Sequence, residues 1–132
     1  MIRRASVWVC VAVVATAGCS GRLDQTVTAT LDNGGDYLKT YDLKGQPTEQ
    51  TLKVDVTSTE SDVDVFIVLA DKVEEFEKAN GDARAKVAAD SKLKTKSASL
   101  SAVIPPKTDS RVIVQLAGMK KTEVTVKMTN KK

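Results

Sequence analysis

The sequence of 132 residues contains no histidine and only two cysteines, Cys10 and Cys19. Without imidazole, neither a Ser-His-Asp triad nor a Cys-His pair can form, and a zinc site of cysteine and histidine cannot be built. Histidine is also the most common general acid or base near neutral pH. Carboxylate pairs, a Ser–Lys pair and metal-assisted chemistry remain open, and the composition favours a protein that is not an enzyme.

Aromatic residues are scarce, with one tryptophan, two tyrosines and two phenylalanines. Single-stranded nucleic acids bind on platforms of several exposed aromatic side chains with basic residues between them, and sugar-binding faces use similar platforms. The net charge is only +3, so a general affinity for polyanions is not implied. We therefore expect no nucleic-acid partner.

The first 18 residues differ from the rest of the chain. Arg3 and Arg4 give a positive start, and residues 5–17 are almost wholly apolar before the small residue Gly18. A basic start, a short apolar run and small residues are typical of a secretory signal peptide. The run is too short to span a bilayer, and the alternative is a buried N-terminal strand or helix. We predict a cleaved signal peptide over residues 1–18.

The end of this segment, Thr16-Ala17-Gly18-Cys19, resembles the lipobox of bacterial lipoproteins. The resemblance implies cleavage before Cys19, lipid attachment to its sulfur, and a location in the bacterial cell envelope, facing the periplasm. It also implies that Ser20 directs the protein to the outer membrane if the bacterium has two membranes. We expect a lipidated tether over residues 19–25, a domain over 26–132, and contact with the membrane through the lipid and with another envelope protein or polymer.

Apolar and polar residues alternate in most segments of the expected domain, as they do in strands with one buried face. In the segment 62–69, however, the second half is apolar on both faces, so we expect it to be covered on both sides. The pattern predicts a mainly β fold, an antiparallel two-sheet sandwich that is jelly-roll-like with about seven strands. The predicted strands are 26–31, 36–43, 51–59, 62–69, 97–104, 110–116 and 122–128.

One short helix is expected near residues 71–80, as the cover for the segment 62–69. Asp71 and Glu74 have the spacing of a capping box, and Phe76 is on the apolar face of the predicted helix. The Ala- and Lys-rich residues 82–96 could extend the helix or form a loop.

Three stretches, SDVDVFIVLADKVEEFEKANG, SRVIVQLAG and TEVTVKMTN, resemble the small sandwiches of the bacterial pre-peptidase C-terminal type. The resemblance covers about residues 50–130. It implies a non-catalytic accessory or binding module with a jelly-roll-like fold.

Asp62 and Asp64 are two residues apart, and Asp55 is expected on a neighbouring strand. Together these carboxylates could offer Ca²⁺ a cluster of hard oxygen ligands and make the protein a calcium-stabilised binding domain. The alternative is that alternate aspartates mark the solvated half of a strand. Calcium is the single cofactor that the sequence suggests, and without it we expect none.

Two further charged stretches have simple interpretations. Glu74, Glu75 and Glu77 would form an acidic, solvated helix face. The basic tail, residues 120–132, could contact anionic lipids, or it could be a charged edge strand that discourages aggregation.

Overall fold

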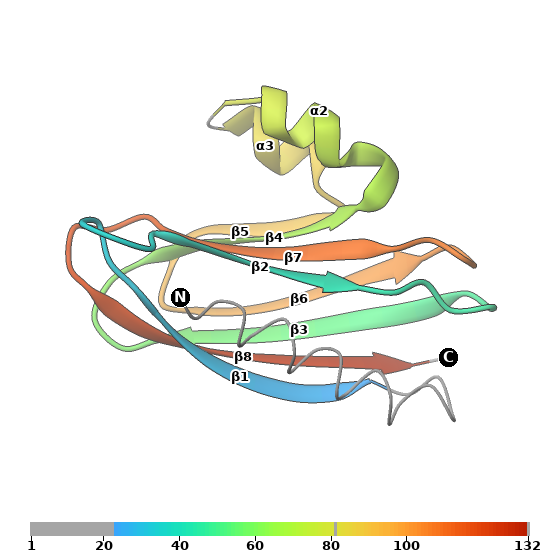
Figure 1. Ribbon diagram of the computed structural model, residues 1–132, viewed down its shortest axis with the longest axis horizontal. Helices are drawn as coiled ribbons and strands as arrows, with labels where there is room; N and C mark the ends of the chain where they lie inside the picture. The colour runs from blue at the N-terminus through green and yellow to red at the C-terminus, as the bar shows by residue number, and fades with distance from the viewer. Residues whose placement is uncertain (1–22, 81, 132) are drawn as a thin grey trace.

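The computed structural model describes residues 23–80 and 82–131. They fold into two layers of strands with helices on one side (Figure 1). In chain order the elements are β1 (Asp24–Leu31), β2 (Leu38–Leu43), β3 (Gln50–Ser58), β4 (Val63–Leu69), a 3₁₀ turn η1 (Ala70–Lys72), α2 (Val73–Lys78), α3 (Asp82–Val87), β5 (Asp90–Thr95), β6 (Ser97–Ile104), β7 (Ser110–Leu116) and β8 (Thr122–Lys131).

The strands form two antiparallel four-stranded sheets, in the orders β1-β8-β3-β6 and β2-β7-β4-β5. This is the strand order of a jelly roll, in which β1 and β2, and likewise β3 and β4, lie in different sheets. The predicted mainly β, two-sheet sandwich is therefore confirmed. The sheets stack face to face, and α2 and α3 lie over the sheet that contains β4 and β7 (Figure 1).

The core lies between the two sheets and consists of alternate residues of the strands. Val54 and Val56 of β3, Ile67 of β4, Val114 of β7 and Val126 of β8 are all fully buried or nearly so. The intervening residues of β3 are turned to solvent. The alternation in the sequence therefore corresponds to burial of one face of each strand.

Strand β4 is buried on both faces, as expected. Val65 and Ile67 belong to the core between the sheets, whereas Phe66 and Val68 belong to a second cluster with Phe76 of α2. The rings of Phe66 and Phe76 meet edge to face, with centroids 4.9 Å apart. This is a favourable geometry for an aromatic pair, and it fastens α2 to the sheet.

Several boundaries differ from the prediction. The sandwich has eight strands, because residues 82–96 contain both α3 and the additional strand β5. The expected capping box is absent, since Asp71 lies inside η1, and α2 begins at Val73 after Lys72 without a side-chain cap. Strand β1 begins at Asp24, two residues before the predicted start.

The edge strands β5 and β6 face each other at one side of the sandwich. Asp90 of β5 joins them, because its Oδ2 accepts the Ser101 N–H at 2.9 Å and its Oδ1 accepts the Ser91 N–H. Strand β5 also carries an irregularity in its pairing with β4, and Lys94 there has a positive φ of 51°. Edge strands interrupted in this way are poor templates for pairing with another chain.

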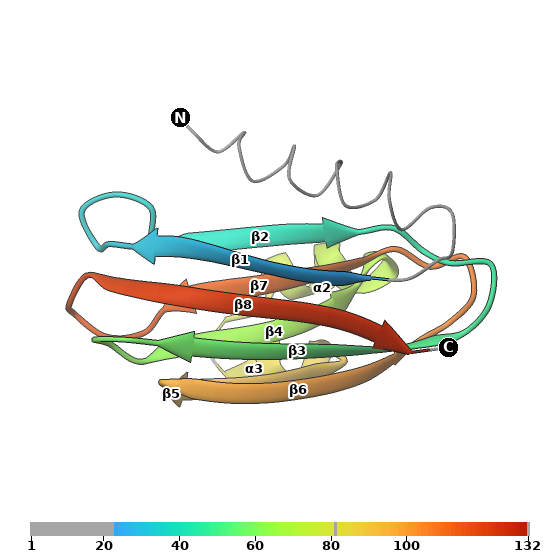
Figure 2. The same cartoon turned by 90° about the horizontal axis from the view of Figure 1, so that it is seen from below.

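The two outer faces of the sandwich differ. Helices α2 and α3 cover part of one, whereas the outer face of the β1-β8-β3-β6 sheet carries no described element (Figure 2). Exposed hydroxyl side chains recur along this open face, among them Thr26, Thr28 and Thr30 of β1 and Ser97 and Ser99 of β6. Short β-branched threonines suit a solvated strand.

A buried hydroxyl cluster ties two loops together at the end where β3 and β7 stop. The Thr122 Oγ1 accepts the N–H groups of Glu60 at 2.9 Å and Ser61 at 3.2 Å, and it bonds the Ser58 Oγ at 2.6 Å. Thr122 is only 1% exposed. Close to it, Gly118 has no room for a side chain, because an added Cβ would lie 2.7 Å from the Ser61 Oγ.

We expect Thr122→Val to lower the free energy of unfolding by about 1–3 kcal/mol, because an isosteric methyl leaves the buried Ser61 N–H and the part-buried Glu60 N–H without an acceptor. Urea unfolding measures the change. Thr125→Val is the matched control, since Thr125 is a half-exposed threonine of the same strand, and we expect it to stay within about 0.5 kcal/mol of the parent. An equal effect of both substitutions would contradict the assigned role of Thr122.

Candidate functional site

A cavity of about 500 Å³ opens between β2, β7 and the turn that leads into α2. It combines apolar walls with two acidic and two basic side chains. Its lining residues are Asp42, Leu43, Lys44, Ala70, Val73, Asp109, Ser110 and Arg111. Cavities of this size with a few convergent polar groups are typical of ligand sites.

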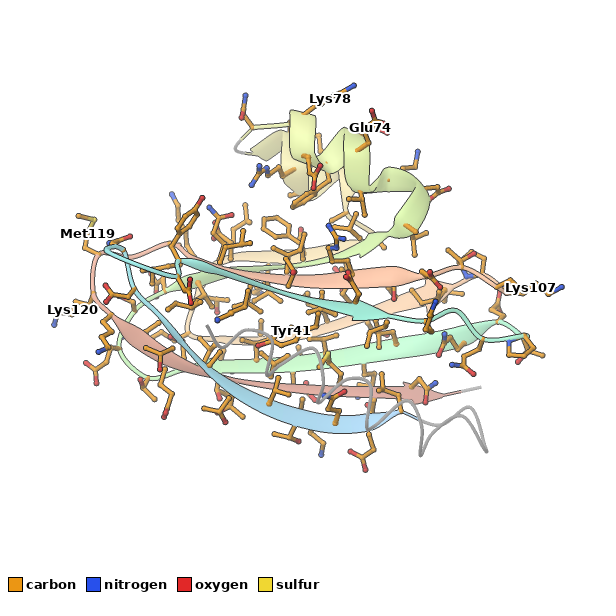
Figure 3. The ribbon with its side chains drawn as sticks, in the orientation of Figure 1. Tyr41, Glu74, Lys78, Lys107, Met119 and Lys120 are labelled. Atoms are coloured by element: carbon orange, nitrogen blue, oxygen red, sulfur yellow. The ribbon has the colours of Figure 1, made fainter. Side chains whose placement is uncertain are left out.

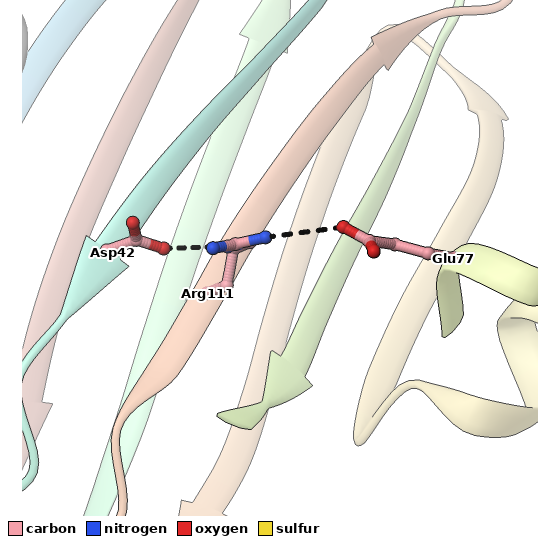
Figure 4. Close-up of polar contacts among 3 residues, drawn as sticks. All are labelled: Asp42, Glu77 and Arg111. Carbon is pink, nitrogen blue, oxygen red and sulfur yellow. Dashed lines mark hydrogen bonds and ion pairs between the residues drawn. The ribbon is translucent and has the colours of Figure 1, made fainter. Parts of the chain in front are cut away.

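Arg111 is the central polar residue of this cavity. Its Nε donates to Asp42 Oδ1 at 2.7 Å, and its Nη1 lies 3.8 Å from Glu77 Oε2 (Figure 4). The three residues come from β7, β2 and α2. Arg111 therefore connects two neighbouring strands to the helix above them and holds its guanidinium in a fixed direction.

Asp109, another residue of the cavity lining, accepts two hydrogen bonds from backbone N–H groups. The Asp109 Oδ1 accepts the Gly45 N–H at 2.7 Å, and the Asp109 carbonyl accepts the Ala70 N–H at 2.9 Å. The loop after β2, the loop before β7 and the start of η1 are thus joined at one residue. The cavity is largely formed before any ligand arrives.

Each carboxylate of the cavity already has a partner, Asp42 in Arg111 and Asp109 in the Gly45 N–H. Ser110 and Lys44 both line the cavity, but the described contacts include no hydrogen bond between them. The arrangement can accept a group with both apolar and polar atoms.

The structure separates the three aspartates for which calcium binding was predicted. Asp55 lies on β3 and accepts the Ser99 hydroxyl at 2.7 Å, whereas Asp64 lies on β4 and accepts the Lys94 N–H at 2.8 Å. The expectation that Asp55 neighbours Asp62 and Asp64 is wrong, because β3 and β4 belong to different sheets. Over residues 23–80 and 82–131, no three acidic or cysteine side chains are grouped to hold a metal.

The other predicted positions are distributed as follows. Cys19 lies outside the described residues. Glu74 and Glu75 are exposed on α2 and pair with Lys78 and Lys72, whereas Glu77 contacts Arg111.

The segment from residue 122 onward is not an edge strand, because β8 lies between β1 and β3. In the described part of the chain, no helix is long and apolar enough to cross a membrane.

Arg111 and Asp42 were not predicted as site residues from the sequence. They are 69 positions apart and meet only because β2 pairs with β7 in the register Asp42↔Arg111. One signal was available, since Asp42 lies between Tyr41 and Leu43 and the oppositely charged Arg111 directly precedes the apolar run of β7. This signal could be interpreted as an ion pair only after the pairing of β2 with β7 was known.

Comparisons with solved structures show the fold. The pre-peptidase C-terminal domain of collagenase from Bacillus anthracis is similar at a TM-score of 0.59 and 12% identity, over 80% of this chain and 89% of that one. A lysozyme inhibitor of Aeromonas hydrophila, the periplasmic protein PliG, gives 0.53 at 12% identity, over 83% and 86%. A mitogen from Yersinia pseudotuberculosis gives 0.52 at 12% identity, over 81% and 85%.

No protein-family model matches the chain. No curated protein matches it by sequence either. The likeness to the pre-peptidase C-terminal domain is therefore one of architecture, at the level of the two-sheet sandwich that both share.

We expect Asp42→Asn to lower the free energy of unfolding by about 0.5–1 kcal/mol, as is usual for a well-formed pair at the surface. Glu77→Gln should cost less, because its distance to Arg111 is 3.8 Å against 2.7 Å for Asp42. Double-mutant cycles with Arg111→Met in urea unfolding give both coupling energies. Glu74→Gln, which affects only an exposed pair within α2, is the control, and equal couplings for Asp42 and Glu77 would contradict this ranking.

Proposed function

We propose that this protein is a non-catalytic, lipid-anchored accessory module of the bacterial cell envelope. Cys19 carries the anchor, and the sandwich serves as a small binding or structural platform for another envelope protein or polymer. The observation that carries the proposal is the position of the lipobox-like cysteine, which precedes by only five residues the first strand, β1, at Asp24.

The junction between the anchor and the sandwich supports this proposal. Two or three acyl chains hold a protein firmly to a bilayer, because each buried methylene contributes about 0.8 kcal/mol. A cysteine at position 19 leaves the whole of β1 within the mature chain. Cleavage before Cys19 would therefore remove no described strand, as a lipoprotein of this fold requires.

The role as an accessory module has two lines of support. The cavity beside Arg111 is preformed, and each of its carboxylates already has a partner. Proteins with this fold also serve in binding roles, since the neighbour from Aeromonas hydrophila is a periplasmic lysozyme inhibitor. We infer that a partner contacts the sandwich without being chemically changed.

Substitution of the cysteines tests the anchor. We expect Cys19→Ser to shift the protein from the membrane fraction to the soluble fraction of the producing bacterium, and to remove the mass of the acyl groups from the N-terminal peptide in mass spectrometry. Cys10→Ser is the matched control, because Cys10 belongs to the segment that cleavage removes, and it should leave both readouts unchanged. A free Cys19 thiol in the membrane-derived protein would overturn the proposal.

A further inference from the structure

The described chain enters the sandwich at a fixed point. The Leu23 N–H donates to Asn130 Oδ1 at 2.7 Å, and the Asn130 N–H donates back to the Leu23 carbonyl at 3.3 Å. The Asn130 side chain also donates to Gln50 Oε1 at 2.7 Å. Leu23 is thus tied to the end of β8 and the start of β3, and β1 begins at the next residue, Asp24.

Leu23 is only four positions after the proposed anchor, Cys19. A fully extended chain of this length reaches about 14 Å. The end of the sandwich where Leu23 enters, which we term the near end, therefore stays close to the bilayer. It includes the loops of residues 44–49 and 105–109, and Lys107 marks it in Figure 3.

The opposite end of the long axis, which we term the far end, carries Met119 and Lys120 (Figure 3). Met119 is 86% exposed, and Asn33 Nδ2 holds its loop by a hydrogen bond to the Met119 carbonyl at 3.0 Å. Strand β8 alone has 10 residues, which corresponds to a length of about 30 Å. The far end is thus separated from the near end by more than the reach of the tether.

The two near-end loops form one rigid surface. The Lys107 N–H donates to the Gln46 carbonyl at 2.6 Å. Gly45 packs so closely on the other loop that an added Cβ would lie 2.5 Å from the Thr108 nitrogen. Lys107 itself has a positive φ of 57°, a conformation that a non-glycine residue adopts only when its surroundings hold it there.

The chemistry of the near end suits a lipid headgroup layer. Lys44 and Lys107 are exposed, and neither forms an ion pair within the described chain. The same loops also carry two exposed acidic residues, Glu49 and Asp109, and the Asp109 carboxylate accepts the Gly45 N–H. Pro47, Pro105 and Pro106 are exposed beside them. Lysines close to an anionic leaflet are attracted to its phosphates, and this attraction acts within about 8–10 Å of the surface.

The two broad faces of the sandwich are less suitable. The helix side presents Glu74, Glu75 and Glu77 on α2 among the basic residues Lys72, Lys78, Arg84 and Lys86, so acidic and basic groups are mixed over this side. The open face of the other sheet carries mainly hydroxyl groups, with opposite charges that neighbour one another, such as Lys53 and Asp55 on β3. The open face also exposes Val103 of β6 and the lysines Lys53 and Lys127, so it is the attachment point at Leu23 that favours the near end over this face.

We propose that the near end rests on the bilayer surface, with Lys44 and Lys107 against the phosphates of anionic headgroups, and that the far end points away from the membrane. This orientation rests on the proposed lipid anchor at Cys19. It adds that the sandwich stands on one end and does not lie on a broad face.

Single cysteines placed in the lipidated protein test this orientation, because Cys19 is then acylated and no other thiol remains in the mature chain. Thr48→Cys labels the near end, Met119→Cys the far end and Glu74→Cys the helix side. Each fluorophore-labelled variant is reconstituted in phosphatidylglycerol vesicles that contain a lipid with a quencher on its headgroup. We expect strong quenching at residue 48 and almost none at residues 74 and 119.

The outcomes separate the two proposals. Failure of the protein to float with the vesicles overturns the anchor and the orientation with it. Flotation with equal quenching at residues 48 and 119, or with strong quenching at residue 74, overturns the orientation alone.

A second arm tests the two lysines. Lys44→Gln with Lys107→Gln, introduced into the residue-48 variant, should reduce quenching in phosphatidylglycerol vesicles to the value in phosphatidylcholine vesicles. Lys120→Gln with Lys121→Gln removes the same charge at the far end and should change nothing. Equal effects of the two pairs would overturn the assigned contact of Lys44 and Lys107 with headgroups.

Discussion

The burial of both faces of β4 constrains the arrangement of everything around it. Its inward residues, Val65 and Ile67, complete the core between the sheets. Its outward residues, Phe66 and Val68, would expose a large apolar area if nothing covered them. Helix α2 supplies the cover through Phe76, and in doing so it brings Glu77 within reach of Arg111 and Val73 to the wall of the cavity. The cavity is thus a consequence of the helix that covers the outer face of β4.

The fold was predictable wherever burial follows a simple period. Strand β6, for example, alternates buried and exposed residues along its whole length. In β4, the apolar second half predicted that both faces of this part of the strand would be covered. Strand β5 escaped prediction because Leu93 is the only apolar residue among its six. Its pairing is also irregular, and Lys94 departs from extended geometry. An edge strand with so little to bury leaves no periodic signal.

The candidate site was less predictable, because it depends on which strands become neighbours. Asp55 and Asp64 belong to consecutive strands, and a hairpin would have brought them together. The jelly roll instead places β3 and β4 in different sheets, and it brings Asp42 beside Arg111 across the long sequence between them. Local patterns define the faces of strands but not their partners. The resemblance to a lipobox is different, since it depends on only four adjacent residues, Thr16-Ala17-Gly18-Cys19.

The contact between β5 and β6 has a consequence under the proposed lipid anchor. Lipid anchors confine molecules to a thin layer, so that neighbours meet far more often than they would at the same amount in free solution. Under those conditions, an edge strand with unpaired backbone groups would favour edge-to-edge pairing between copies of the chain. Asp90 accepts the Ser91 N–H of its own strand with one oxygen and the Ser101 N–H of β6 with the other. The Ser101 N–H is therefore not available to the backbone of another chain. One carboxylate thus helps to prevent pairing between the β6 edges of neighbouring copies of the chain.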